Sequence, residues 1–110
     1  MDIELITSGR KKAFRVKAFH NGDFIGYGRM YIGDTRTKIS AMEIVKNYRG
    51  HGIGSSIIRE FERIFAEKKG SGYIFVKSTL KAADFYEKNG YWMCGAIQEG
   101  DTTVEMMTFI

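Results

Sequence analysis

Hydrophobic and polar residues alternate with a period of two through much of the first half of the chain, which is typical of half-buried β-strands. In the segment 12–20, apolar positions alternate with two cations: Phe14, Val16 and Ala18 with Arg15 and Lys17. Asn21 and Gly22 follow, and both tolerate positive φ, so we expect a hairpin that pairs this strand with residues 24–32. We also expect strands at 3–7, ending at a break over 8–10, and at 38–45 after a turn at Gly33 and Asp34.

The period changes to that of a helix after Gly52. Six apolar residues recur at helical spacing, with charged residues on the opposite face: Ile53, Ile57, Ile58, Phe61, Ile64 and Phe65. Lys68 and Lys69 suit the negative end of the helix dipole, and Gly70 predicts the end of the helix.

The last forty residues predict one more helix and three strands. We expect a strand at 73–77, a helix at 81–88 capped by Asn89 and Gly90, and strands at 91–97 and 103–109 joined by a turn at 99–101. Four strands, helix, strand, helix, two strands is the order of a mixed α/β (α+β) sheet. A chain of 110 residues is the size of a single domain, so residues 1–110 are assigned to one.

Composition narrows the possible partners only slightly. The net charge of +4 favours anionic partners, although a lysine-rich soluble surface explains it equally well. A nucleic-acid binder would concentrate its cations on one face beside exposed aromatic residues, whereas acids and bases are interspersed along the long predicted helix, so nucleic acid is not expected. There is one cysteine and no basic leader or membrane-length apolar run, so we expect a cytoplasmic protein without membrane contact. His20 and His51 are far apart, and no metal-ligand spacing is present.

The segment 47–55 is rich in glycine and lies where a predicted strand passes into the long helix. Unpaired N–H groups and the helix dipole at such a point favour a phosphate or diphosphate, and glycine lets the ligand approach the backbone closely. Arg49 can add a charged hydrogen bond. The pattern lacks the Lys of a Walker A loop and the spacing and acidic residue of a dinucleotide fingerprint. A glycine-rich connection without a ligand is the alternative.

Two motifs then resemble those of one family. The sequence from Arg49 to Gly54 is similar to the Arg/Gln-x-x-Gly-x-Gly/Ala motif of the GNAT acyltransferase superfamily, and residues 82–91 resemble its later Ala-x-x-(Leu/Phe)-Tyr-x-Lys-x-Gly-(Phe/Tyr) motif. The resemblance extends from residue 12 to the end of the chain. It implies a β-β-β-β-α-β-α-β-β order, with a mostly antiparallel sheet splayed at the coenzyme site. It also implies transfer of an acetyl group from acetyl-CoA to an amine acceptor.

The resemblance assigns roles to the coenzyme-binding residues. The diphosphate would be held by a continuous loop: Arg49, Gly50, His51, Gly52, Ile53, Gly54 and Ser55. The backbone of Ile44 and Val45 would pair with the pantetheine arm, and an N–H there would hold the thioester oxygen. Thr79 stands where the family commonly has Asn, and Lys88, with Lys81 as a weaker candidate, would meet coenzyme phosphates. A solvated lysine at a helix end is the alternative for Lys88.

The resemblance also suggests how the two protons of the reaction are handled. Tyr86 would protonate the leaving thiolate, and its alternative is a core aromatic residue. Glu43, which interrupts the apolar segment 41–45, is the candidate base; a solvent-facing or ion-paired glutamate is the alternative. Cys94 lies in an apolar stretch and is expected to be a small buried side chain.

One family feature is missing from this chain. The family usually places two helices between its first and second strands, where they wall off the acceptor site, and here only residues 8–11 separate those strands. We expect either an open side that suits a large acceptor, such as a protein lysine, an N-terminus or a tRNA-like polymer, or a homodimer whose second subunit supplies the wall. A catalytically inactive coenzyme-binding or protein-interaction module with the same fold is the alternative function.

Overall fold

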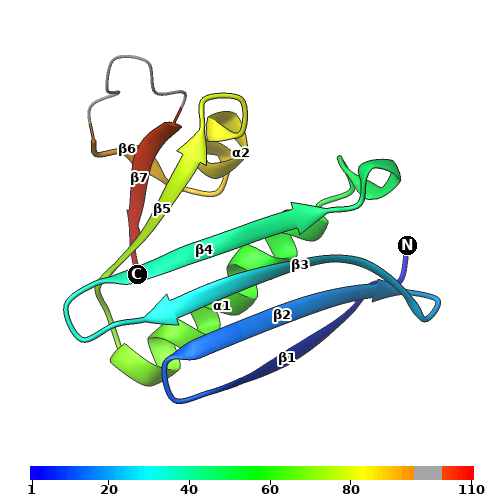
Figure 1. Ribbon diagram of the computed structural model, residues 1–110, viewed down its shortest axis with the longest axis horizontal. Helices are drawn as coiled ribbons and strands as arrows, with labels where there is room; N and C mark the ends of the chain where they lie inside the picture. Colours follow the sequence, from blue (N-terminus) through cyan, green and yellow to red (C-terminus); the bar gives the residue numbers. More distant parts are fainter. Residues whose placement is uncertain (96–102) are drawn as a thin grey trace.

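The alternating segments of the first half form four consecutive antiparallel strands (Figure 1). These are β1 (Glu4–Arg10), β2 (Ala13–His20), β3 (Asp23–Ile32) and β4 (Thr37–Ile44). The chain continues through a short 3-10 helix, η1 (Lys46–Tyr48), then α1 (Ile53–Lys69), β5 (Tyr73–Thr79), α2 (Ala83–Lys88), β6 (Trp92–Met93) and β7 (Thr103–Phe109). The computed structural model describes residues 1–95 and 103–110. Within them the strands form one sheet of order β1-β2-β3-β4-β5-β7-β6, so the expected mixed sheet with two helices is confirmed.

The connection between β1 and β2 is even shorter than the sequence predicts. β1 continues through the expected break and pairs up to Arg10, opposite Ala13. Gly9 lies inside the strand with φ +142, and a Cβ there would come 2.2 Å from the Ala13 carbonyl oxygen. The chain turns at Lys11, whose φ is +61. This tight turn leaves no residues for helices between the two strands.

Both helices pack on the same face of the sheet. α1 contacts β2, β3 and β4 and lies behind them in Figure 1, and its apolar stripe closes the core, with Ile57 and Phe61 fully buried. Gly28 lets α1 approach β3 closely, because a Cβ there would come 2.9 Å from Ile57 and from Phe61. α2 contacts β7, and the hydroxyl of Thr108 donates a hydrogen bond to the Gly90 carbonyl. Among the described residues no helix covers the opposite face of β2–β4, and the molecule is only 19 Å thick along its shortest axis.

Helix ends match the predicted capping residues, with one shift. α1 ends at Gly70, where φ is +81 and the N–H donates to the Ala66 carbonyl. α2 ends at Lys88 with Asn89 as its C-cap; the Gly90 N–H donates to the Glu87 carbonyl and the Tyr91 N–H to the Tyr86 carbonyl, the two bonds of a Schellman motif. The start of α2 is two residues later than predicted.

The last predicted strands are only partly observed. The strand expected at 91–97 is β6, which covers only Trp92 and Met93, and residues 96–97 and the turn at 99–101 lie outside the described residues. The prediction that Cys94 is buried is wrong. Cys94 is exposed because its segment forms the edge of the sheet, beyond β7. In the described part of the chain no helix combines the length and apolar character needed to span a bilayer.

The sheet opens between β4 and β5. These two strands run parallel and pair only where Thr37–Ile39 meets Ile74–Val76. Just beyond, Ser40 is an extra residue in β4, because Ile39 pairs with Met30 and Ala41 pairs with Arg29. Such a β-bulge bends its strand. The carboxyl-terminal ends of β4 and β5 therefore diverge, as Figure 1 shows, and no hydrogen bonds join the two strands there. The gap between them lies near the first turn of α1.

Candidate functional site

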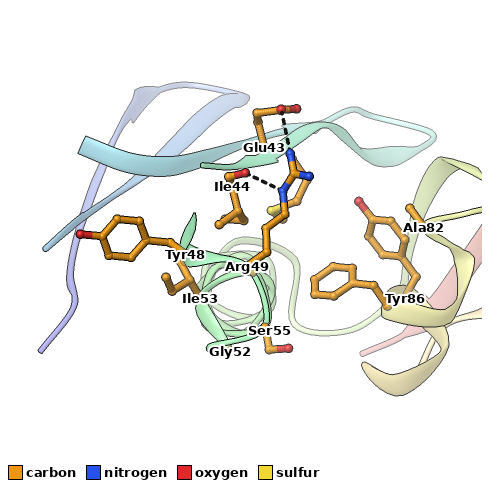
Figure 2. Close-up of a pocket in the computed structure, with 13 residues that line it drawn as sticks. Glu43, Ile44, Tyr48, Arg49, Gly52, Ile53, Ser55, Ala82 and Tyr86 are labelled. Atoms are coloured by element: carbon orange, nitrogen blue, oxygen red, sulfur yellow. Dashed lines mark hydrogen bonds and ion pairs between the residues drawn. The ribbon is translucent and has the colours of Figure 1, made fainter. Parts of the chain in front are cut away.

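The divergence of β4 and β5 creates a cavity of about 480 Å³. One wall is the end of β4, a second is the glycine loop with the first turn of α1, and the third is α2 (Figure 2). Thirteen residues line it: Met42, Glu43, Ile44, Tyr48, Arg49, Gly50, Gly52, Ile53, Gly54, Ser55, Ala82, Phe85 and Tyr86. Nine of the thirteen sequence-predicted site residues are among them, which places both recognised motifs on one cavity.

The first turn of α1 presents unpaired backbone N–H groups. Gly52 is the N-cap with φ +80, a conformation that favours glycine, and it forms no side-chain cap. The first hydrogen bond of the helix runs from the Ser56 N–H to the Gly52 carbonyl, at 3.0 Å. The N–H groups of the residues between them, Ile53, Gly54 and Ser55, have no backbone partner in the described chain. With the helix dipole behind them, they suit an anionic ligand.

Gly54 has a packing role that the sequence does not reveal. A Cβ at this position would come 2.9 Å from Cζ of Phe85 and 3.0 Å from Cε1. The absence of a side chain at Gly54 therefore lets α2 pack closely against the first turn of α1. The third glycine of the loop sets the spacing of two cavity walls.

The backbone of β4 presents Ile44 to the gap. The Val45 N–H donates to the Ile25 carbonyl at 2.9 Å, so the hydrogen-bonding groups of Val45 and, two residues earlier, Glu43 face β3. Those of Ile44, between them, face the open side. The Val45 carbonyl in turn accepts from Tyr48. The sequence predicts a free N–H at Ile44 or Val45; the Val45 N–H is used inside the sheet, so of these two only the Ile44 N–H faces the gap.

Arg49 lies along this open edge. Its Nε donates to the Ile44 carbonyl at 3.0 Å, and its Nη2 lies 3.8 Å from Oε1 of Glu43 (Figure 2). Both side chains are mostly exposed, so the ion pair is weak. The loop is also attached to the β2–β3 hairpin, where Nδ1 of His20 and the hydroxyl of Tyr48 are 3.2 Å apart.

Tyr86 forms the wall opposite Arg49. Its side chain is buried between the rings of Phe85 and Tyr91, with centroids 5.0 and 5.7 Å away. In Figure 2 its hydroxyl-bearing ring faces β4 across the cavity. Burial raises the pKa of Tyr86 to about 12, because removal from water penalises the phenolate. The phenol is therefore protonated at neutral pH and can donate a proton.

A second cavity of about 570 Å³ adjoins the first. It also contains Ser40, Ala41, Lys77 and Thr79, and the last two lie on strand positions that alternate with the buried Val76 and Ser78. Val76 and Ser78 line it too, and successive strand side chains point to opposite faces, so this cavity opens onto the face without helices as well as toward the core. The two cavities share five residues: Met42, Glu43, Arg49, Ala82 and Tyr86. The gap is therefore accessible from both faces of the sheet, with Tyr86 between them.

Four predicted residues lie outside the first cavity. Val45 is turned into the sheet, as described above. His51 lines a separate hollow beside Met1 and Ile3. Thr79 lines the second cavity, and its hydroxyl oxygen accepts the Ala82 N–H, which holds the turn before α2 and delays the helix. Lys88 is exposed in the last turn of α2 and lines neither cavity.

Four lining residues were not predicted as part of the site: Met42, Tyr48, Ala82 and Phe85. A signal for each is present in the sequence. Tyr48 directly precedes the predicted loop at Arg49. Met42 is two positions before Ile44 and so shares its side of the strand. Ala82 and Phe85 belong to the same motif as Tyr86: Ala82 lies about one helical turn before it, and Phe85 immediately precedes it.

A comparison with protein families matches one family model to nearly the whole chain, including both motifs. Residues 4–107 match the model of the acetyltransferase (GNAT) domain. The chain belongs to the GNAT acetyltransferase family. Solved GNAT structures agree in fold: the PaiA N-acetyltransferase from Thermoplasma acidophilum in complex with coenzyme A has a TM-score of 0.80 at 18% identity, covering 90% of this chain and 62% of that one. An aminoglycoside 6'-N-acetyltransferase complexed with coenzyme A has a TM-score of 0.77 at 15% identity, covering 89% and 73%.

Two relatives of this chain come from Bacillus subtilis (strain 168). The protein YyaT is 34% identical over 76 residues, which cover 69% of this chain and 51% of YyaT. The N-acetyltransferase YjcF is 33% identical over 67 residues, which cover 61% of this chain and 47% of YjcF. The chain therefore spans about half the length of these curated relatives.

Proposed function

We propose that this chain is an acetyl-CoA-dependent N-acetyltransferase that acts in the cytoplasm on an amine carried by a macromolecule. The observation that carries the proposal is the arrangement around one cavity. Unpaired amides of α1 and the open edge of β4 lie on one side, and the buried, protonated Tyr86 lies on the other. Membership of the GNAT family supports acyl transfer, and the coenzyme A bound to two related folds supports the choice of donor.

The chain's own groups fit such a donor. A diphosphate would be held by the N–H groups of Ile53, Gly54 and Ser55, with positive charge from Arg49. The pantetheine arm carries amide groups, which can pair with the N–H and C=O of Ile44 as an added strand would. Arg49 donates to that C=O, so its side chain would turn from Ile44 toward the phosphates when the donor enters.

The reaction then needs two proton transfers. The acceptor nitrogen attacks the thioester carbonyl carbon, a C–N bond forms, and the C–S bond breaks. Tyr86 gives its phenolic proton to the departing sulfur, which leaves as a thiol. Glu43, directly or through a water molecule, takes the proton that the amine loses, and solvent exchange returns a proton to Tyr86. Glu43 suits this role because it lines both cavities and is open to solvent.

The alternative is a module that binds coenzyme without catalysis. The exposed, ion-paired state of Glu43 favours it, since that is the environment of a surface glutamate. A homodimer, in which a second copy completes the acceptor side, is compatible with either function, and its presence can be checked by light scattering.

The test combines calorimetric titration of acetyl-CoA with mass spectrometry of a lysine peptide after incubation. The enzyme predicts binding together with an acetyl adduct, and Tyr86→Phe should lower turnover by about 10²- to 10⁴-fold while acetyl-CoA still binds. Binding with no adduct on any lysine or N-terminal amine would favour the module. No binding of acetyl-CoA would reject both.

A further inference from the structure

The face of the sheet without helices carries a cluster of cations beside aromatic rings. We call it the β2–β3 patch, and it consists of Arg15, Lys17, Phe24, Tyr27 and Arg29, which together line a hollow of about 420 Å³. The ring of Phe24 stacks on Tyr27 with centroids 6.2 Å apart, and the Arg29 guanidinium lies 5.9 Å from the Tyr27 centroid. Phe24 is 49% exposed although it is a large apolar residue.

The register places two like charges directly opposite one another. Arg15 pairs with Arg29 across β2 and β3, and Lys17 pairs with Tyr27. Like charges in opposed positions of one sheet face destabilise the pairing. Within residues 1–95 and 103–110, none of the three cations forms an ion pair with a carboxylate. The described residues therefore leave these three cations without an ion-pair partner, which gives the patch positive potential.

The patch is next to the second cavity. Tyr27 is the cross-strand partner of Glu43, and Arg29 is the partner of Ala41. Glu43 and Ala41 both line the second cavity, which ends at Tyr86. A chain bound on the patch can therefore extend across β4 and deliver a side chain to Tyr86 from the side opposite α1.

We propose that the β2–β3 patch docks an acidic polypeptide whose amine is the acetyl acceptor. The inference rests on the proposed acetyltransferase function, and it names the substrate class. Arg15 and Arg29 are close enough to hold one carboxylate between them, and Lys17 can hold a second. Phe24 and Tyr27 supply apolar contact for the rest of the segment.

Cations beside exposed aromatic rings are also the features of a nucleic-acid site, and the sequence does not predict them on one face, but the charge next to the patch favours a polypeptide. The carboxylate of Glu43 borders the patch beside Tyr27, and it would repel a continuous phosphate backbone. Separate carboxylates on a peptide can avoid it. Adjacent strands lie about 4.8 Å apart, so two strand spacings separate the patch from the gap, which is roughly three or four extended residues. The acidic residues should therefore lie about four positions from the reacting amine.

The experiment compares two peptides that differ only in charge. Each carries one lysine and, four positions away, either three glutamates or three glutamines. The wild-type chain should acetylate the glutamate peptide with a kcat/KM at least about tenfold higher, and the preference should disappear at about 0.5 M salt, where charges are screened within a few ångströms. Arg15→Gln combined with Arg29→Gln should abolish the preference. Arg59→Gln combined with Arg63→Gln removes the same charge from α1 and should preserve it.

A second arm works without catalysis. Fluorescence anisotropy measures binding of a labelled glutamate-rich peptide that has no free amine, and of a labelled oligouridylate. Peptide binding that depends on Arg15 and Arg29 supports the docking site even if no acetyl transfer is found. Acetyl transfer that is equal for both peptides overturns docking and leaves the enzyme intact. Tighter binding of the oligouridylate to the same arginines also overturns the proposal, because the patch would then be a nucleic-acid site.

Discussion

Gly54 and Phe85 are in contact across the junction of α1 and α2, and the missing side chain of one makes room for the ring of the other. Gly54→Ala should therefore push α2 outward, lower stability by about 1–3 kcal/mol, as overpacking does, and weaken acetyl-CoA binding. Urea unfolding and calorimetric titration measure the two effects. Phe85→Leu removes the ring atoms that the new Cβ would meet. The double variant should therefore recover much of the lost stability and of the lost acetyl-CoA binding. If Gly54→Ala left both the free energy of unfolding and acetyl-CoA binding unchanged, the packing role of Gly54 would be contradicted.

Glu43→Gln separates two roles of that carboxylate. If Glu43 accepts the amine proton, kcat/KM for the acceptor should fall about 10²-fold or more, since that is the scale of general-base catalysis. The KM for acetyl-CoA should change little, because the pair with Arg49 is loose and exposed. Steady-state kinetics with each substrate varied in turn distinguishes the cases. A loss confined to the acetyl-CoA KM would mean that Glu43 only positions Arg49.

Tyr91→Phe should stabilise the protein. The Tyr91 hydroxyl is buried without a hydrogen-bond partner in the described chain, and such a group costs about 1–3 kcal/mol. Removing the oxygen while keeping the ring should raise the free energy of unfolding by about 1 kcal/mol in urea titrations. Tyr48→Phe is the matched control: it removes a hydroxyl that does have a partner, His20, and should be neutral or destabilising. The reverse order of the two variants would refute the argument.

Alkaline pH should destabilise the fold through Tyr86. Its pKa is about 12 in the folded protein, against about 10 in an unfolded chain, so the folded state holds more protons between these values. Stability should be unaffected by this residue below pH 10 and should fall as pH rises toward 12, by up to about 1.4 kcal/mol per pH unit. The pKa of Tyr91 is raised by burial too and adds to the same trend. Urea midpoints from pH 9 to 11.5 should fall less steeply for Tyr86→Phe than for wild type.

The sequence predicts the elements well where a pattern repeats, as in α1, whose apolar spacing and terminal Gly70 define it without tertiary information. The sequence predicts local structure and burial incorrectly where one tertiary contact determines them. Gly9 resembles a turn residue, but it is needed inside β1 because Ala13 approaches its backbone. Cys94 is apolar, but burial depends on whether another strand lies beyond it.

The motifs locate the site but not its geometry. They indicate the loop and Tyr86 correctly as neighbours of one cavity, because both motifs are local sequences with fixed structures. They do not distinguish the N–H of Ile44 from that of Val45, since the choice depends on how β4 is paired with β3. The β2–β3 patch is likewise invisible in the sequence, because Arg15 and Arg29 meet only after the hairpin forms.

The extra residue at Ser40 determines which face of the sheet each later side chain of β4 points to, and which of its backbone groups pair with β3. Without that insertion, Ile44 would stand opposite Ile25 with its amide committed to the sheet, and Glu43 would point into the packed interior. The Ile44 backbone groups would then face β3, and the Glu43 carboxylate would point away from the cavities. A single unpaired amino acid thus orients both the backbone offered to the donor and the carboxylate offered to the acceptor.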